Sequence, residues 1–400
     1  MDFYSKETWD FIIQHENEDL KALELKKRAN PAINYYGAFQ QLHGRALAKR
    51  KLPSWLDKDK LIYPYHLSLE QCSSEYTAQY KASLIKDKGE SFADLTGGFG
   101  VDFVFLSSRF SSGYFVEKRE ELCDIARYNF PQLVSSAYTI FCKYGIGWLI
   151  EREDNSLDLI YIDPARRSQS GGKIIKISDC EPNMEEWQDL FLKKGKRVMI
   201  KLSPMLNIAE ALKNLKHIQE IHIVSIFNEC KEFLICIGKQ NSSPSVSCVN
   251  LSKSMEWEVF SYPLASGGEK KETYYTSEIG NYLYEPNTSI LKAGATDLLS
   301  KQFNLKKLHP NSHLFTGDEY LATFPGRKFK VSAVGRFNKR DIAALLGKEK
   351  RANLTVRNFP SSVEELRKRL KLREGGETFL FATTLYNGNK VLITTSKAFR

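Results

Sequence analysis

Three acidic side chains stand where short apolar runs end, and each could take part in binding chemistry. Asp94 ends the first run, Glu117 follows the run 113–116, and Asp163 follows the run 157–162. Ligands of a doubly wound sheet gather at the carboxyl ends of its parallel strands, so we expect the three carboxylates on one edge. There they could bind a cationic group, ribose hydroxyls and a substrate amine.

The residues after Asp94 form a glycine-rich turn that could hold a nucleotide-like cofactor. Glycines let the backbone approach a ligand closely. The helix predicted from residue 101 would add free N–H groups and a positive dipole end. The turn predicts an adenosine-type cofactor, with these cofactor-binding candidates: Asp94, Thr96, Gly97, Gly98 and Gly100.

Two cofactors compete for this turn. A dinucleotide site of the form G-x-G-x-x-G needs a third glycine, but Phe103 occupies that place counting from Gly98,. A carboxylate at Asp94 suits a cationic amino acid moiety better than a phosphate, which favours S-adenosylmethionine. An ordinary strand-to-helix turn without a ligand is the third interpretation.

Glu117 is the predicted ribose ligand. It lies 23 residues after Asp94, close to the spacing of about 20 residues at which an acid contacts ribose hydroxyls in nucleotide-binding units. The adenine ring is expected near residues 143–146, where no residue is diagnostic.

The motif Asp163-Pro164-Ala165-Arg166-Arg167 is the candidate for substrate chemistry. Pro164 fixes the backbone after Asp163, whose carboxylate could orient a substrate amine or accept its proton. We therefore assign Asp163 and Pro164 as catalytic candidates. The candidate substrate-binding residues here are Arg166, Arg167 and, after the fifth predicted strand, Lys201. An Asp-Pro turn without function is the alternative.

The elements that must position these residues fall into four predicted domains. The 400 residues leave room for several cores,. Helical periodicity predicts an N-terminal helical region over 1–86, and alternating strands and helices predict a doubly wound α/β domain over 87–240 that ends in an antiparallel hairpin. A linker-like stretch precedes a small α+β connector over 246–320 and a basic α/β domain over 321–400.

The predicted helix over 68–84 leads directly into the first strand of the α/β domain. Its polar side chains could cover the cofactor, or they could form an ordinary solvated face.

Positive charge is concentrated at the C-terminal end. Residues 321–400 hold 18 Lys or Arg against 6 Asp or Glu, while the whole chain has a net charge of +10. Such a surplus attracts polyanions and favours RNA as a partner, although a solvated surface is the plainer interpretation. In the helix predicted over 361–372, Ser361 and Glu364 suggest a capping box, and Val363, Leu366 and Leu370 a buried stripe. The candidate phosphate contacts on its other faces are Arg367, Lys368 and Lys371.

Other classes of protein are disfavoured by composition. The seven cysteines form no C-x-x-C pair, so we expect reduced thiols and no metal site,. Neither a membrane-spanning apolar run nor a secretory leader is present, so we expect a soluble, cytoplasmic protein without a membrane partner. Oligomeric state cannot be predicted.

Together the motifs resemble a class I S-adenosylmethionine-dependent methyltransferase, and more narrowly a bacterial group with a C-terminal THUMP-like domain. The narrower resemblance rests on further segments: Lys201-Leu202-Ser203-Pro204-Met205, Tyr284-Glu285-Pro286-Asn287, His309-Pro310-Asn311-Ser312-His313, Phe324-Pro325-Gly326-Arg327 and Phe381-Ala382-Thr383-Thr384. It implies a Rossmann-like seven-stranded sheet, S-adenosylmethionine as cofactor, an RNA substrate such as tRNA or rRNA, and a ferredoxin-like fold in the connector.

One departure from the motif of amino-group methyltransferases limits the chemistry. Those enzymes carry an aromatic residue directly after the second proline position. Here Ala165 holds that proline position and Arg166 the aromatic one, so base stacking would fall to Tyr161 or Tyr144. Since the motif lacks a cysteine nucleophile, a base nitrogen is the preferred target. The alternatives are methylation of a small molecule or protein, and an RNA-binding protein that keeps the fold without catalysis.

Overall fold

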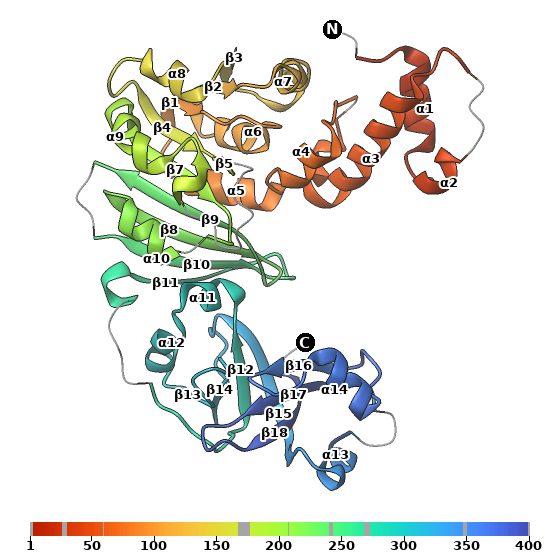
Figure 1. Ribbon diagram of the computed structural model, residues 1–400, viewed down its shortest axis with the longest axis vertical. Coiled ribbons are helices and arrows are strands. Elements are labelled where there is room, and N and C mark those ends of the chain that lie inside the picture. Colours follow the sequence, from red (N-terminus) through yellow and green to blue (C-terminus); the bar gives the residue numbers. More distant parts are fainter. Residues whose placement is uncertain are drawn as a thin grey trace. The chain divides into compact units, whose positions relative to one another are not determined.

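The computed structural model describes residues 3–25, 30–58, 60–166, 177–206, 208–239, 243–267, 273–346 and 350–398. The chain divides into two compact units. Unit 1 comprises Met1–Ile221 and Lys231–Ser242, and unit 2 comprises His222–Cys230 and Ser243–Arg400. The boundary between them falls within strand β8. Figure 1 colours both units by sequence.

Unit 1 begins with the predicted helical region, drawn in red to orange in Figure 1. Its elements are α1 (Lys6–His15), α2 (Leu20–Glu24), α3 (Tyr35–Lys51), the 3₁₀ turn η1 (Pro53–Trp55), α4 (His66–Gln71) and α5 (Glu75–Ser83). The side chains of Ser5, Asp19, Asn34 and Ser74 each accept a hydrogen bond from a backbone N–H in the first turn of a helix, which stabilises the helix starts.

The single helix predicted over 68–84 was wrong, because the chain breaks it into α4 and α5. Cys72 and Ser74 have extended backbone conformations. The Ser74 hydroxyl accepts from the Thr77 N–H at 3.3 Å, so Ser74 caps a new helix instead of continuing the old one,. The break leaves Ser73 in the turn between the two helices.

The sheet of unit 1 confirms the predicted class I methyltransferase topology. Its strands are β1 (Gly89–Asp94), β2 (Phe110–Glu117), β3 (Ala137–Cys142), β4 (Leu157–Ile162), β7 (Gly195–Leu202) and β9 (Glu229–Gly238), and β8 (Ile218–Ile226) lies beside β9. The order is β3-β2-β1-β4-β7-β9. All neighbours are parallel except β9, which is antiparallel to β7. The carboxyl ends of β1, β2 and β4 therefore meet at one edge.

Both faces of this sheet are covered by helices: α6 (Val101–Ser107), α7 (Glu120–Leu133), α8 (Gly145–Ile150), α9 (Met184–Lys194) and α10 (Ile208–Asn214). On one face, Phe103 of α6 stacks between Phe92 and Phe130, with ring centroids 5.0 and 5.1 Å away. On the other, Trp148 of α8 packs on Tyr114 at 5.4 Å. A small ribbon of β5 (Ala165–Arg166) and β6 (Cys180–Glu181) follows β4.

Unit 2 contains a hairpin, β10 (Ser245–Leu251) with β11 (Trp257–Pro263), and a seven-stranded sheet of order β13-β14-β12-β15-β18-β17-β16. The strands of that sheet are β12 (Tyr282–Pro286), β13 (Lys306–Lys307), β14 (Phe315–Gly317), β15 (Gly326–Arg336), β16 (Asn353–Arg357), β17 (Phe379–Thr384) and β18 (Lys390–Lys397). The helices are α11 (Thr288–Ala293), α12 (Thr296–Gln302), α13 (Lys339–Leu346) and α14 (Val363–Leu370).

Alternation along β17 gives the C-terminal sheet two apolar faces. Phe381 packs with Leu283, Leu314 and Phe329, whereas Leu380 packs with Leu366. Leu308 and Leu314, from the segment between β13 and β14, thus pack on one face of the sheet, and α14 packs on the other. Among the described residues, no helix combines the length and apolarity needed to cross a bilayer.

The start of α14 differs from the prediction by one residue. The capping box pairs Ser362 with Glu365, not Ser361 with Glu364, and the helix begins at Val363. Leu366 and Leu370 are buried as expected, but Val363 is exposed because it lies in the first turn, beside the cap.

Candidate active site

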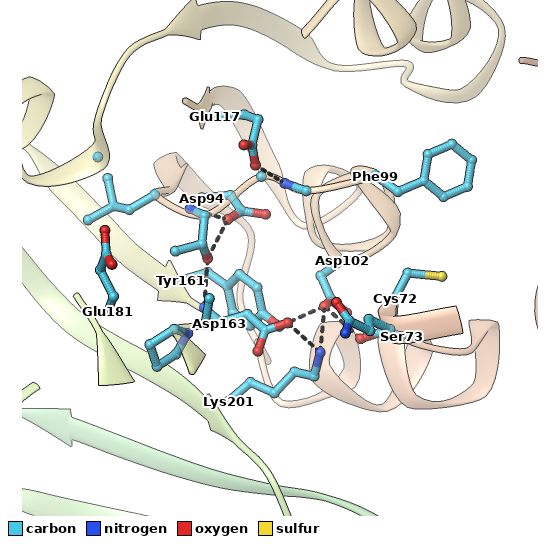
Figure 2. A pocket seen from close by; sticks show the side chains of 18 of the residues that line it. Cys72, Ser73, Asp94, Phe99, Asp102, Glu117, Tyr161, Asp163, Glu181 and Lys201 are labelled. Atoms are coloured by element: carbon cyan, nitrogen blue, oxygen red, sulfur yellow. Dashed lines mark hydrogen bonds and ion pairs between the residues drawn. The ribbon is translucent and has the colours of Figure 1, made fainter. Parts of the chain in front are cut away.

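A cavity of about 730 Å³ opens at the carboxyl edge of the sheet in unit 1. Its lining includes the glycine turn, the ends of β2 and β4, the start of α8, the turn between α4 and α5, and residues 201–204 at the end of β7. Figure 2 shows this cavity from close by. The structure therefore brings together the candidates Asp94, Glu117, Asp163 and Lys201.

Thr96 connects the ends of β1 and β4. Its hydroxyl lies 3.4 Å from Asp94 Oδ1 and accepts a hydrogen bond from the Asp163 N–H at 2.7 Å, while its own N–H donates to Asp94 Oδ1 at 3.0 Å. Thr96 therefore holds the two acidic segments in a fixed relation.

Glu117 turns toward the glycine turn. Its Oε2 accepts from the Gly98 N–H at 2.7 Å, and its Oε1 accepts from the Arg119 N–H at 2.9 Å. The side chain is buried yet lines the cavity. A carboxylate oxygen has two lone pairs, so Glu117 can still accept from hydroxyl groups of a ligand.

The three glycines of the turn have different surroundings. A Cβ at Gly97 would lie 2.4 Å from the Phe115 ring, and one at Gly100 would lie 2.8 Å from the Phe130 ring. At Gly98, which has φ +58°, the nearest atom is a backbone oxygen 3.6 Å away. Gly97 and Gly100 let the turn pack on the aromatic core, whereas Gly98 leaves space inside the cavity.

Burial dominates the electrostatics of Asp94. Desolvation raises the pKa of this carboxyl well above its usual value, and the nearby Asp102, Asp163 and Glu117 raise it further,. A bound cation would offset this effect. The Asp94 carboxylate is therefore suited to bind a positively charged ligand group. Without such a group, its ionised form is unfavourable.

Asp163 is paired with a lysine. Lys201 Nζ lies 2.5 Å from Asp163 Oδ2 and 4.0 Å from Asp102 Oδ2. Burial lowers the pKa of Lys201, but the Asp163 and Asp102 carboxylates outweigh it and raise the pKa above its ordinary value. Lys201 stays protonated, and the pair leaves Asp163 Oδ1 as the acceptor that can face a ligand.

Behind this pair lies a buried network that sequence reasoning missed. Asp102 Oδ2 accepts from Ser73 Oγ at 2.7 Å and from the Tyr161 hydroxyl at 2.6 Å. Lys81, fully buried in α5, lies 3.0 Å from Asp102 Oδ1 and 2.7 Å from Glu232 Oε2. An i, i+8 pair such as Ser73 and Lys81 gives no recognisable sequence signal. The sequence signal that could have indicated this network was the presence of charged residues within the apolar patterns of α5, α6 and β9.

Two tyrosines were the candidates for base stacking. Tyr161 is among the residues that line the cavity, but its side chain is buried and its hydroxyl donates to Asp102. Tyr144 lines the cavity and is 44% exposed. Cys72 also lines the cavity, but its thiol donates to Leu69 O at 3.0 Å, and burial raises its pKa to about 11. A thiol in that state is a poor nucleophile at neutral pH.

The remaining candidates are spread over both units. Pro164 lines the cavity. The backbone of Arg166 pairs with Cys180, but its side chain, like the whole of Arg167, lies outside the described residues. In unit 2, Arg367 of α14 is 3.2 Å from Glu374, Lys368 is exposed, and Lys371 is the exposed C-cap residue of that helix.

The whole chain is similar to a solved structure. It aligns over 100% of both chains, at 32% identity and a TM-score of 0.88, with a crystal structure named "putative methyltransferase from Porphyromonas gingivalis W83". Residues 282–325 match a family of ferredoxin-like domains, and residues 326–397 match a THUMP domain-like family. This chain is a class I methyltransferase of the family with a C-terminal THUMP-like domain.

Other methyltransferases are much less similar. An rRNA methylase from Streptococcus thermophilus aligns over 42% of this chain and 96% of its own, at 12% identity and a TM-score of 0.31. M. capricolum TrmK in complex with S-adenosyl-homocysteine aligns over 42% and 69%, at 13% identity and a TM-score of 0.32. These values are too low to support an argument about this methyltransferase. No curated protein matches its sequence significantly.

Proposed function

We propose that this methyltransferase uses S-adenosylmethionine to methylate a base nitrogen in structured RNA, such as tRNA or rRNA. The observation that carries the proposal is the pairing of Asp163 with Lys201 in the cavity that Gly98 and Glu117 also line. The basic surplus of residues 321–400 supports RNA as the substrate,.

The cavity suits the cofactor in three respects. Space beside Gly98 admits a close approach to the backbone, Glu117 offers carboxylate oxygens to ribose hydroxyls, and buried Asp94 favours a cationic amino acid moiety,. Bound S-adenosylmethionine would supply a methyl group activated by a positively charged sulfur.

Asp163 orients the substrate in this proposal. Lys201 Nζ contacts Asp163 Oδ2, which leaves Asp163 Oδ1 to accept a hydrogen bond from a substrate N–H,. Fixing the N–H fixes the direction of the nitrogen lone pair, and alignment is most of what methyl transfer needs. The motif that begins at Asp163 contains no cysteine nucleophile, which favours nitrogen over carbon as the target.

Transfer of radiolabelled methyl from S-adenosylmethionine into total RNA of a strain lacking the protein tests the proposal. We expect incorporation with wild type and a loss of about 100-fold or more with Asp163→Ala. Asp154→Ala, which removes a surface carboxylate paired with Lys193 and Lys194, is the matched control and should retain activity. Absence of label in RNA, with cofactor binding verified by calorimetry, would contradict an RNA substrate and direct the assay to proteins and small molecules.

A further inference from the structure

Four segments that are far apart in the sequence meet in unit 2, and the proposed active site uses none of them. They are the end of β12, the loop 309–313, the start of β15 and the end of β16. We define the junction cluster as Glu285, His309, His313, Arg327, Arg357 and Asn358. It lies where the ferredoxin-like and THUMP-like regions adjoin.

Glu285 is the centre of the junction cluster. It is 1% exposed, and two arginines approach it from different strands. Arg327 Nε donates to Oε2 at 2.6 Å, and Arg357 donates to Oε1 from Nε at 2.9 Å and from Nη2 at 2.7 Å. Each guanidinium is thus fixed in orientation through its Nε edge.

One arginine would be enough to neutralise a buried carboxylate. The second leaves the group with a net charge of +1, and the two guanidinium side chains are 39% and 37% exposed. Among the described residues, the Nη1 group of each arginine has no hydrogen-bond partner. Fixed, half-exposed guanidinium groups with free donors match the geometry of phosphate oxygens.

The neighbouring histidines add polar atoms to the junction cluster. His309 Nδ1 lies 3.0 Å from the Asn311 N–H and 2.9 Å from Asn358 Nδ2, so it is the acceptor nitrogen and the proton resides on Nε2,. His313 Nδ1 is buried without a hydrogen-bond partner in the described part of the chain. The Thr384 hydroxyl fixes the loop of Asn358 by donating to its carbonyl at 2.6 Å.

We propose that the junction cluster binds a phosphate group of the RNA substrate, with Arg327 and Arg357 as the principal contacts. This inference rests on the proposed function. It makes the junction cluster, instead of α14, the principal phosphate contact. On α14, Arg367 is paired with Glu374, and Lys368 is a solvated side chain without a fixed partner among the described residues. A preorganised guanidinium pair loses less side-chain entropy on binding than free lysines.

The test compares single variants of the full chain in binding a labelled RNA hairpin as salt is varied. Arg357→Gln leaves Arg327 to neutralise Glu285, and Lys368→Gln is the control with the same change of charge. We expect Arg357→Gln to weaken binding about tenfold and to reduce the salt slope by about one, and Lys368→Gln to change affinity less than about twofold. Equal effects of the two variants would overturn the proposal.

Further arms separate the alternatives. Arg357→Lys keeps the positive charge but removes the planar guanidinium group, so it should still weaken RNA binding. If Arg357→Gln does not fold, His309→Ala takes its place in the RNA-binding test. Comparing hairpins with a 5′-phosphate and with a 5′-hydroxyl distinguishes binding of a terminal phosphate from binding of a backbone phosphate. Competition by inorganic phosphate shows whether the junction cluster binds the free ion. Unchanged RNA affinity in Arg357→Gln, while wild type still methylates RNA, would refute the junction cluster alone. Absence of RNA methylation would refute the proposed function instead.

Discussion

The two halves of the cavity in unit 1 are built differently. The glycine-turn half comprises Asp94, Thr96, Gly98 and Glu117, and short local hydrogen bonds connect it. The ion-pair half comprises Asp163 and Lys201 with the charges behind them, which come from α5, α6, β4, β7 and β9. Backbone shape dominates the first half, and the balance of buried charges dominates the second.

This difference teaches that the halves should fail in different ways. A change of shape in the glycine-turn half should affect ligand binding while the fold persists. A change of charge in the ion-pair half should affect the fold itself, because an unpaired buried charge is strongly unfavourable.

Lys81→Met should have the largest effect. It leaves Asp102 and Glu232 buried without their common cation, so we expect the free energy of unfolding to fall by about 3–5 kcal/mol. Chemical denaturation measures it, with exposed Lys88→Met as the control. Adding Glu232→Gln to Lys81→Met should recover part of the loss, and a loss below about 1 kcal/mol would argue against a charge-dependent ion-pair half.

Gly98→Leu should have an intermediate effect, on ligand binding. The new side chain would enter the cavity, and we expect the affinity for S-adenosylhomocysteine to fall by about 100-fold, or about 2.7 kcal/mol. Gly294→Leu controls for backbone strain, because Gly294 has φ +66° and open surroundings. Calorimetry gives both affinities, and retained binding by Gly98→Leu would place the ligand elsewhere.

The pH dependence of ligand binding should be the smallest effect. Because burial raises the pKa of Asp94, the ligand-free protein keeps this proton as pH rises. The cationic amino acid moiety of S-adenosylhomocysteine binds better to the Asp94 carboxylate than to the protonated carboxyl group. The affinity should therefore increase as pH rises to the raised pKa of Asp94, by at most about tenfold per pH unit. Calorimetry across pH should show this increase in wild type and a flat profile in Asp94→Asn.

The same shift has the opposite sign for stability. A carboxyl with a raised pKa in the folded state contributes stability that is fully present below its unfolded-state pKa and is lost as pH rises from there through the folded-state pKa. Asp94→Asn should therefore unfold at a higher denaturant concentration than wild type at neutral pH. A less stable Asp94→Asn would mean that the Thr96 hydrogen bonds outweigh the desolvation of Asp94.

The glycine-turn half was readable from sequence because its signals are local. Asp94, the glycines and Glu117 mark strand ends, and strand order alone brings them together. The topology of the sheet followed from alternating strands and helices and from the short link between β8 and β9. The order of the seven strands from β3 to β8 was therefore predictable.

The ion-pair half was not readable because its partners are distant in sequence and have no pattern. Lys81 and Glu232 are 151 residues apart. Local sequence patterns also led to two wrong predictions. Ser74 interrupts a pattern that looks like one helix, and the adjacent serines Ser361 and Ser362 could not be distinguished as the N-cap of α14. The arginine pair on Glu285 was hidden for the same reason as the lysine network.

Thr96 has a consequence for how accurately the methyltransferase can place two reactants. One hydroxyl oxygen contacts both the carboxylate at the end of β1 and the backbone N–H of Asp163. The two halves therefore share one hydrogen-bonding atom, and the lengths of two hydrogen bonds limit how far they can move apart. Under the proposed function, a small displacement of β1 relative to β4 would therefore move the cofactor site and Asp163 together.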